Sequence, residues 1–278
     1  MKAYSYRFYD CPDPIRNAFD CAKQVHELAK TPVNGSSGAI WFRGQAKWKW
    51  DLVPSVGRRK DWPKKVSDAN ESDRPKLLLD HERVLLQRFE RDGYPFLKEM
   101  LTDWEAIILG QHYGLPTRLL DWTSDVFVAL FFAAVEELRS DGAIFAYRPR
   151  ADSTHHVSIF EGQNPRKPAV PDPFTLNGVK IVFPIMLADR LVAQSGGLTI
   201  QDPLKCLMCR ARPNKFDKSE LDIAALMRWR LPRKNKPKIL DQLHRFGVNR
   251  RRLFPGLDTV ARTLAWQEQF RKHPGGYR

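Results

Sequence analysis

The sequence has few cysteines, no long apolar run and none of the motifs that mark the common enzyme classes. Its longest apolar run covers the ten residues 126–135, which is too short to cross a bilayer and fits a buried helix. The first residues contain no apolar stretch of the kind found in a secretory signal. We therefore expect a cytoplasmic protein that has no contact with a membrane.

The absent motifs exclude several kinds of site. The chain has no glycine-rich phosphate loop, no glycine fingerprint for dinucleotides, no nucleophile elbow and no paired-histidine zinc motif. Of its four cysteines, Cys206 and Cys209 form a single C-x-x-C, whereas a structural zinc site needs four ligands. We therefore expect reduced thiols and no bound metal.

Positive charge is abundant but unevenly distributed. Residues 205–278 carry 19 Lys and Arg against 6 Asp and Glu, so that they hold +13 of the net charge of +14. A basic face of this kind attracts phosphate polymers, and a surface for an acidic protein is the alternative. The residues expected to bind nucleic acid are Arg228, Arg230, Arg233, Lys234, Lys236, Arg250, Arg251 and Arg252. Helical periodicity is expected over 219–230, 238–246 and 257–270.

The most informative stretch runs from Gln111 to Ala134 and reads QHYGLPTRLLDWTSDVFVALFFAA. A turn at Gly114-Leu115-Pro116 precedes alternation over 117–123, which is typical of a half-buried strand. Ser124 or Asp125 can cap the apolar helix that follows. Polar groups therefore gather where a strand meets a core helix. That arrangement suits a binding site, and it equally suits a corner whose polar groups satisfy one another.

A second candidate is the run Phe42-Arg43-Gly44-Gln45, at the end of a short strand. Gly44 lets the backbone approach a ligand closely. Arg43 can offer a planar, bidentate fork to a phosphate or carboxylate. Alternatively, Arg43 pairs with a carboxylate at the edge of the core, such as Asp121.

Tryptophan is the third candidate feature. The rings of Trp48, Trp50 and Trp122 could supply a stacking surface for a flat base. Plain packing in the core is the alternative, and composition alone favours it.

Several of these segments resemble one family, the FRG domain, which is named for its Phe-Arg-Gly motif. The resemblance covers about residues 36–265. It rests on Phe42-Arg43-Gly44, Trp50-x-Leu52-x-Pro54-Ser55, Glu82-x-x-Leu85-Leu86-x-x-Phe89, the run from Gln111 to Thr123, Gln194-Ser195-Gly196 and Phe254-Pro255-Gly256-Leu257-Asp258.

The layout of that family is similar to that of ADP-ribosyltransferases, which implies NAD as a substrate. In those enzymes an Arg on the first core strand binds the NAD phosphates, and Arg43 matches it. A Ser or Thr ends the second strand, where Thr123 stands. A Glu on a later strand stabilises the transition state, but no Glu-x-Glu or Gln-x-Glu follows the central helix, and Gln194 lies near the expected position. The residues expected to contact NAD are Arg43, Gly44, Gln45, Arg118 and Trp122.

Two further residues have expected roles in the reaction. Cleavage of the nicotinamide glycosidic bond leaves positive charge on the ribose, and the acceptor must lose a proton. His112 or Asp121 could take that proton. Asp121 could instead hold Arg43 or Arg118 in place.

The resemblance and the charge together predict an α+β fold with a small split β-sheet surrounded by helices, and a basic helical C-terminal part packed on the same core. The expected segments are 1–35, 36–204 and 205–278. The expected function is a toxin or antiviral-defence effector that transfers ADP-ribose from NAD to nucleic acid. RNA is the expected acceptor, and a neutralising antitoxin is the expected partner. The alternatives are a non-catalytic module that binds nucleic acid or nucleotide, and a protein-interaction domain.

Overall fold

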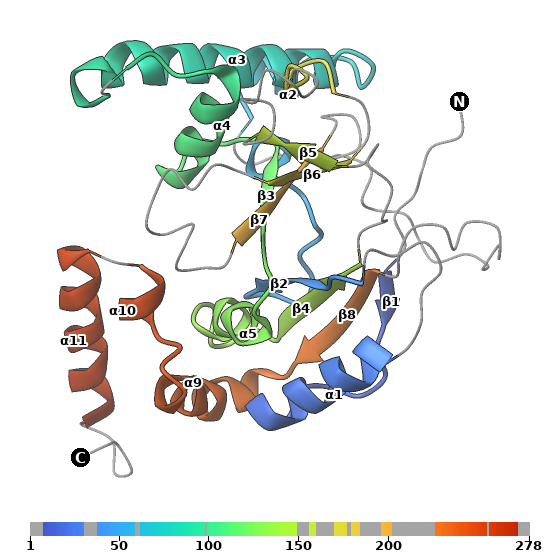
Figure 1. Cartoon of the computed structure of the whole chain (residues 1–278), viewed down its shortest axis with the longest axis vertical. Coiled ribbons are helices and arrows are strands. Elements are labelled where there is room, and N and C mark those ends of the chain that lie inside the picture. Colours follow the sequence, from blue (N-terminus) through green and yellow to red (C-terminus); the bar gives the residue numbers. More distant parts are fainter. Residues whose placement is uncertain are drawn as a thin grey trace.

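Short strands from all parts of the chain join into one sheet in the computed structural model (Figure 1). The strands are β1 (Phe8–Asp10), β2 (Trp41–Gln45), β3 (Leu119–Thr123), β4 (Gly142–Tyr147), β5 (His156–Ser158), β6 (Lys180–Phe183), β7 (Gly196–Ile200) and β8 (Leu226–Leu231). The α-helices are α1 (Ala18–Lys30), α2 (Lys64–Ser67), α3 (Arg74–Gly93), α4 (Asp103–His112), α5 (Val126–Ala134), α9 (Lys236–Arg245), α10 (Arg250–Leu253) and α11 (Leu257–Arg271). The structure describes residues 8–30, 38–58, 62–97, 99–148, 156–159, 170–176, 179–183, 196–201, 226–254 and 256–271.

The sheet has eight strands in the order β1-β8-β4-β2-β3-β7-β6-β5 and contains both parallel and antiparallel pairs. This mixed architecture is consistent with the expected α+β class, although the expected sheet was smaller. In the middle of the sheet, β2 and β3 pair only at Phe42 and Thr123, whereas β2 pairs with β4, and β3 with β7, over five residue pairs each. The sheet therefore has two halves that meet at one residue pair.

Each half has its own group of helices (Figure 1). Helices α1, α5 and α9 bury their apolar side chains against β2, β4 and β8 in one core cluster. Helices α3 and α4 contribute to a second cluster with β3, β6 and β7. Helix α4 begins at a capping box, in which Thr102 accepts from the backbone of Glu105 and the Glu105 side chain accepts in return. None of the described helices is long and apolar enough to cross a membrane.

Helix α5 lies directly on β2, and glycine makes this contact possible. The expected apolar helix is confirmed, and Asp125 caps it by accepting a hydrogen bond from the Phe127 amide at 2.8 Å. A Cβ atom on Gly44 would lie 1.8 Å from the carbonyl oxygen of Ala129. The close neighbour of Gly44 is therefore the backbone of α5, whereas the sequence suggested a ligand at this position.

The C-terminal part is less helical than expected. Residues 226–231 form β8, although the sequence predicted a helix over 219–230, of which 219–225 lie outside the described residues. Trp229 and Leu231 are buried while Arg230 is exposed, so that the side chains alternate as a strand requires. Because β8 lies between β1 and β4, segments near both ends of the chain complete the half-sheet that contains β2.

Lys236 connects α9 to the end of α5 and is fully buried. Its Nζ donates to the carbonyl oxygens of Ala46 at 2.9 Å, Glu136 at 2.9 Å and Glu137 at 3.1 Å. Two of these bonds satisfy carbonyl groups beyond the last turn of α5, and the third satisfies the residue that follows β2. Burial lowers the pKa of Lys236 to about 8, and the nearby carboxylates of Asp141, Glu137 and Glu136 oppose this shift.

The contact of α5 with β2 predicts that Gly44→Ala destabilises the protein. The added methyl group has no space, because the neighbouring atoms belong to the helix backbone. We expect the free energy of unfolding, measured by urea denaturation, to fall by about 3 kcal/mol or more. Gly93→Ala is the control, because a Cβ there meets nothing within 4 Å, and it should change stability by less than about 1 kcal/mol. Equal effects of the two changes would contradict the packing described here.

Lys236 predicts a dependence of stability on pH. Between pH 8 and the ordinary pKa of 10.5, the unfolded chain binds this proton more tightly than the folded chain. Raising the pH through this window therefore increases the free energy of unfolding. We expect the stability of the wild type relative to Lys236→Met to rise by about 1.5 kcal/mol between pH 8 and pH 9.5, measured by urea denaturation.

Burial raises the pKa of the Cys11 and Cys21 thiols to about 12, so they titrate in the opposite sense above pH 9. Both thiols titrate in the wild type and in Lys236→Met alike. The difference in free energy of unfolding between the two proteins therefore reports on Lys236 alone. Lys238→Met, at an exposed position of α9, is the matched control and should follow the wild type. A difference between wild type and Lys236→Met that is independent of pH would contradict the assignment.

Candidate functional site

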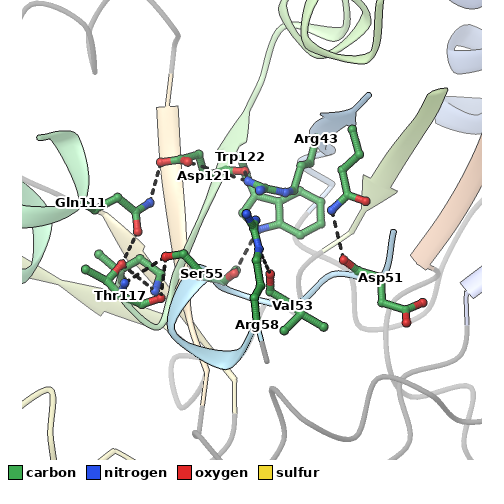
Figure 2. A network of polar contacts seen from close by, with 12 residues as sticks. Arg43, Asp51, Val53, Ser55, Arg58, Gln111, Thr117, Asp121 and Trp122 are labelled. Carbon is green, nitrogen blue, oxygen red and sulfur yellow. Dashed lines mark hydrogen bonds and ion pairs between the residues drawn. The ribbon is translucent and has the colours of Figure 1, made fainter. Parts of the chain in front are cut away.

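Arg43 fills the opening where β2 and β3 separate (Figure 2). Continued antiparallel pairing beyond Phe42 and Thr123 would place Gly44 opposite Asp121, but the strands diverge before that pair forms. Instead, Nη1 of Arg43 donates to the main-chain carbonyl oxygen of Asp121 at 2.6 Å. The guanidinium group thus takes the place of a lost bond of the sheet.

The Arg43 guanidinium keeps donors that no described residue uses. Its Nε is buried and has no hydrogen-bond partner in the described part of the chain. The nearest carboxylate oxygen, Oδ2 of Asp121, lies 3.8 Å from Nη1, which is too far for a good hydrogen bond. Burial lowers the pKa of Arg43, the charge of Asp121 raises it, and the charge of Arg58 lowers it further. The side chain is 14% exposed, whereas that of Asp121 is 57% exposed.

A chain of hydrogen bonds extends from Asp121 along the segments quoted for the FRG resemblance (Figure 2). Gln111, at the end of α4, donates from Nε2 to Oδ1 of Asp121 at 2.8 Å. Its Oε1 accepts from the hydroxyl group of Thr117. The amide of Thr117 donates to Oγ of Ser55 at 3.0 Å. The polar groups of three separate segments therefore fix one another around the opening.

Arg118 does not lie with these groups, because its side chain is 1% exposed in the interior. Its Nε donates to Oε2 of Glu82 at 2.5 Å, and its Nη2 donates to the carbonyl oxygen of Pro173 at 3.0 Å. Its guanidinium carbon also lies 5.3 Å from the centre of the Phe174 ring. This buried ion pair occupies Arg118, so the expected contact with NAD is not available to it in this structure.

The Trp122 ring, expected to stack on a cofactor, is 5% exposed and belongs to the core. Its Nε1 donates to the hydroxyl group of Thr199 at 2.9 Å, and its ring lies 5.6 Å from that of Tyr147. Trp48 stacks on Arg228, whose guanidinium carbon lies 3.8 Å from the centre of the Trp48 ring. Trp50 is 43% exposed, with Nζ of Lys47 5.3 Å from its ring centre. Of the three tryptophans, Trp50 is the most exposed and Trp48 is partly exposed.

Thr123 and Gln45 are both buried at this junction. The hydroxyl group of Thr123, which is 5% exposed, accepts from the amide of Asp125 at 3.0 Å. It thereby shapes the turn that leads into α5. Gln45 donates from Nε2 to the carbonyl oxygen of Asp51 at 3.2 Å, while its Oε1 is buried and lacks a partner among the described residues. An acceptor therefore remains two residues beyond Arg43, on the same face of β2.

His112 and Gln194 are not placed at Arg43 by the structure. The ring of His112 packs edge-on against Tyr113, with ring centres 5.0 Å apart, at the C-terminal end of α4. Gln194 lies outside the described residues. The structure describes Gly196, which pairs with Thr123. The expected roles of His112 and Gln194 remain predictions.

The residues expected to bind nucleic acid divide into buried and exposed groups. Lys236 is buried on three carbonyl oxygens, and Arg228 is 12% exposed and paired with Asp10 at 2.7 Å. Neither can contact a phosphate in this structure, which corrects the expectation for both. Arg230 is exposed but paired with Asp141 at 2.5 Å. Arg250 is partly buried, with its guanidinium carbon 5.6 Å from the ring centre of Phe254. The remaining residues of the expected set are exposed, namely Arg233, Lys234, Arg251 and Arg252.

Sequence reasoning missed the partners that fix the site. Glu82 was quoted for the FRG resemblance, but no partner was expected for it. The buried positions of α3 are Pro75, Leu78, Glu82 and Leu86. A charged residue at helical spacing from Leu78 and Leu86 was the available signal, because a buried carboxylate requires a partner. No such signal marked Ser55 or Thr117 as partners, because their contact joins distant segments.

Comparison with known proteins agrees with the motifs. Residues 38–142 match the family model of the FRG domain, so the chain contains an FRG domain over this segment. No curated protein and no solved structure gives a significant match. The matched segment contains β2, β3 and helices α2 to α5, but it ends at the first residue of β4. The strands that flank β2 and β3 therefore lie almost entirely outside the match.

The Glu82–Arg118 pair predicts a large loss of stability when one charge is removed. Glu82→Gln leaves the buried Arg118 without a counter-ion. We expect the free energy of unfolding to fall by about 3–5 kcal/mol in urea denaturation. Asp80→Asn, at an exposed position of the same helix, should change it by less than about 0.5 kcal/mol. A small effect of Glu82→Gln would show that the pair does not hold α3 to β3.

Proposed function

We propose that this FRG-domain protein is an NAD-dependent ADP-ribosyltransferase that acts as a toxin or antiviral-defence effector. Its proposed acceptor is nucleic acid, and RNA in particular. One observation carries the proposal. A half-buried arginine with unused donors lies beside an exposed carboxylate, at the opening between the two central strands. This pairing supplies a cation for a phosphate group and an anion for a sugar that develops positive charge.

The reaction assigns a task to each of these groups. Arg43 binds a pyrophosphate oxygen of NAD, and its burial strengthens that interaction. The bond between the ribose anomeric carbon and nicotinamide breaks, and nicotinamide leaves with the bonding electrons. The acceptor atom then bonds to the anomeric carbon and releases a proton. Asp121 faces the positive ribose in the transition state, in the role of the acidic residue that the sequence lacks elsewhere, and His112 takes the proton of the acceptor.

The surroundings of Asp121 support this assignment. Its Oδ1 is held by Gln111 at 2.8 Å, which fixes the carboxylate plane, while the long contact from Oδ2 to Arg43 leaves that oxygen accessible. A preorganised carboxylate stabilises developing charge without having to reorient during the reaction. Gln45 Oε1, which is buried without a described partner, is a candidate acceptor for a ribose hydroxyl group.

The exposed Arg233, Lys234, Arg251 and Arg252 support nucleic acid as the acceptor. Such an activity would damage the cell that makes it, so the proposal includes a protein antitoxin as partner.

A second function is a non-catalytic module that binds a nucleotide or nucleic acid. The observation in its favour is that Thr123, expected to act on the ribose, is buried and already accepts from Asp125. Arg43 likewise donates to the sheet itself. On this alternative, the FRG residues stabilise a binding surface and no bond is broken.

Label transfer distinguishes the two functions. Purified protein is incubated with NAD labelled in its adenylate part, and with RNA, DNA or lysate proteins in separate reactions. We expect label on RNA, and Asp121→Asn should reduce the rate by about 10²-fold or more, as loss of a charge-stabilising group does. Asp125→Asn is the matched control, since it removes a neighbouring carboxylate while asparagine still caps α5.

Each negative result has a separate meaning. RNA binding without label transfer to any acceptor would reject the enzyme and leave the binding module. Transfer that survives Asp121→Asn would reject this carboxylate as the group that faces the ribose. Transfer only to lysate proteins would reject nucleic acid as the acceptor.

A further inference from the structure

Arg58 lies beside the candidate site but belongs to none of the groups expected from the sequence. It follows the 3-10 helix Ser55–Gly57, and its amide donates to the carbonyl oxygen of Ser55 at 3.1 Å. Ser55 is in turn held by Thr117 at the start of β3. The backbone of Arg58 is therefore fixed to the strand that carries Asp121.

Figure 2 shows the Arg58 side chain pointing toward Arg43, and the charge of Arg58 acts on that arginine. Within the described structure, the only hydrogen bond of the Arg58 side chain is from Nε to the carbonyl oxygen of Val53, at 3.4 Å. Both terminal nitrogen atoms of the Arg58 fork are therefore unused by the described residues. They lie on an exposed side chain that can reach a ligand.

Positive charge exceeds negative charge at this point. The two charges that act on Arg43 are Asp121, which raises its pKa, and Arg58, which lowers it. Asp121 is mostly exposed and 3.8 Å away, so it neutralises neither arginine fully. Two adjacent guanidinium groups repel each other, and the buried Nε of Arg43 lacks an acceptor among the described residues. An anion with several oxygen atoms that binds between the two groups would relieve this repulsion.

We infer that Arg43 and Arg58 together bind the pyrophosphate of a dinucleotide, with Arg58 as the solvent-side arm of the clamp. A pyrophosphate presents oxygen atoms on two linked phosphorus atoms, which matches two forks carried by different segments. Arg43 on β2 takes one phosphate and Arg58 takes the other. The inference rests on the proposed function for the identity of the ligand, but it concerns binding and needs no turnover.

Calorimetric titration tests the role of Arg58. Wild type, Arg58→Gln and Arg58→Lys are titrated with ADP-ribose, inorganic pyrophosphate and adenosine at one salt concentration. We expect Arg58→Gln to lower the affinity for ADP-ribose and for pyrophosphate by about tenfold, because one charge-assisted hydrogen bond is lost. Adenosine binding should stay unchanged, and Arg58→Lys should lose less than Arg58→Gln because it keeps the charge.

Two controls separate a local contact from general electrostatics. Arg88→Gln removes the same charge from an exposed position on α3 and should bind ADP-ribose as the wild type does. Thermal unfolding of each variant reports whether the fold is retained. Titration of the same variants with an oligoribonucleotide, in the absence of NAD, tests whether Arg58 binds the phosphates of a polymer instead of those of a dinucleotide.

Several results would overturn the inference. These are absent binding of ADP-ribose to the wild type, an unchanged affinity in Arg58→Gln, or an equal loss in Arg88→Gln. A loss confined to the oligoribonucleotide would assign Arg58 to nucleic acid and reject the dinucleotide. ADP-ribose binding that depends on Arg58 but is accompanied by no label transfer would instead uphold the clamp and reject the proposed reaction.

Discussion

The contact between the backbone of α5 and β2 determines the geometry of the rest of the molecule. The chain leaves β3 at Thr123 and enters α5 three residues later, so the helix must cross over β2 at once. It can do so only because Gly44 has no side chain. With the helix seated there, β2 and β3 meet at one residue pair and then separate. The opening that contains Arg43 and Asp121 is thus a consequence of helix packing.

This constraint explains why the FRG motif mixes glycine with polar residues. Gly44 serves the helix, Arg43 bonds the separated strand, and Gln111 holds Asp121 from the other side. The same side chains therefore support the fold and line the candidate site. A residue with two such roles is difficult to interpret from a substitution that only abolishes activity. Asp121 is the most informative member, because its Oδ2 is both exposed and far from a tight partner.

The sequence predicted local features well, because these depend on neighbouring residues. The apolar run gave α5 with its Asp125 cap, and the helix expected over 238–246 is α9, which is followed by Gly247 with a φ of 78°. Residues 226–230 of β8 were predicted to be the end of a helix over 219–230, because a short segment of mixed apolar and basic residues does not distinguish the helical from the strand period. This segment is a strand because it pairs with β1 and β4, and these partners are more than 70 residues away in the sequence.

The candidate site was predicted in part, for a similar reason. Arg43 and Asp121 were expected to meet and do so, whereas Arg118, next to them in the motif, turns inward to Glu82. Successive residues of a strand face opposite sides, so neighbours in a motif need not share a site. Lys236 shows the limit of charge counting, since a lysine counted toward a basic surface is buried on three carbonyl groups. Arg58 acquires its significance only when the 3-10 helix brings it to Arg43.

The position of β8 between β1 and β4 also has a consequence for synthesis of the chain. Strand β1 has no partner until residue 226 has left the ribosome, because its described pairing is with β8 alone. Until then, β4 presents an open edge, and the core around the α5–β2 contact lacks the side chains that β8 and α9 contribute. The half-sheet that carries Arg43 can therefore assemble fully only after β8 has been synthesised.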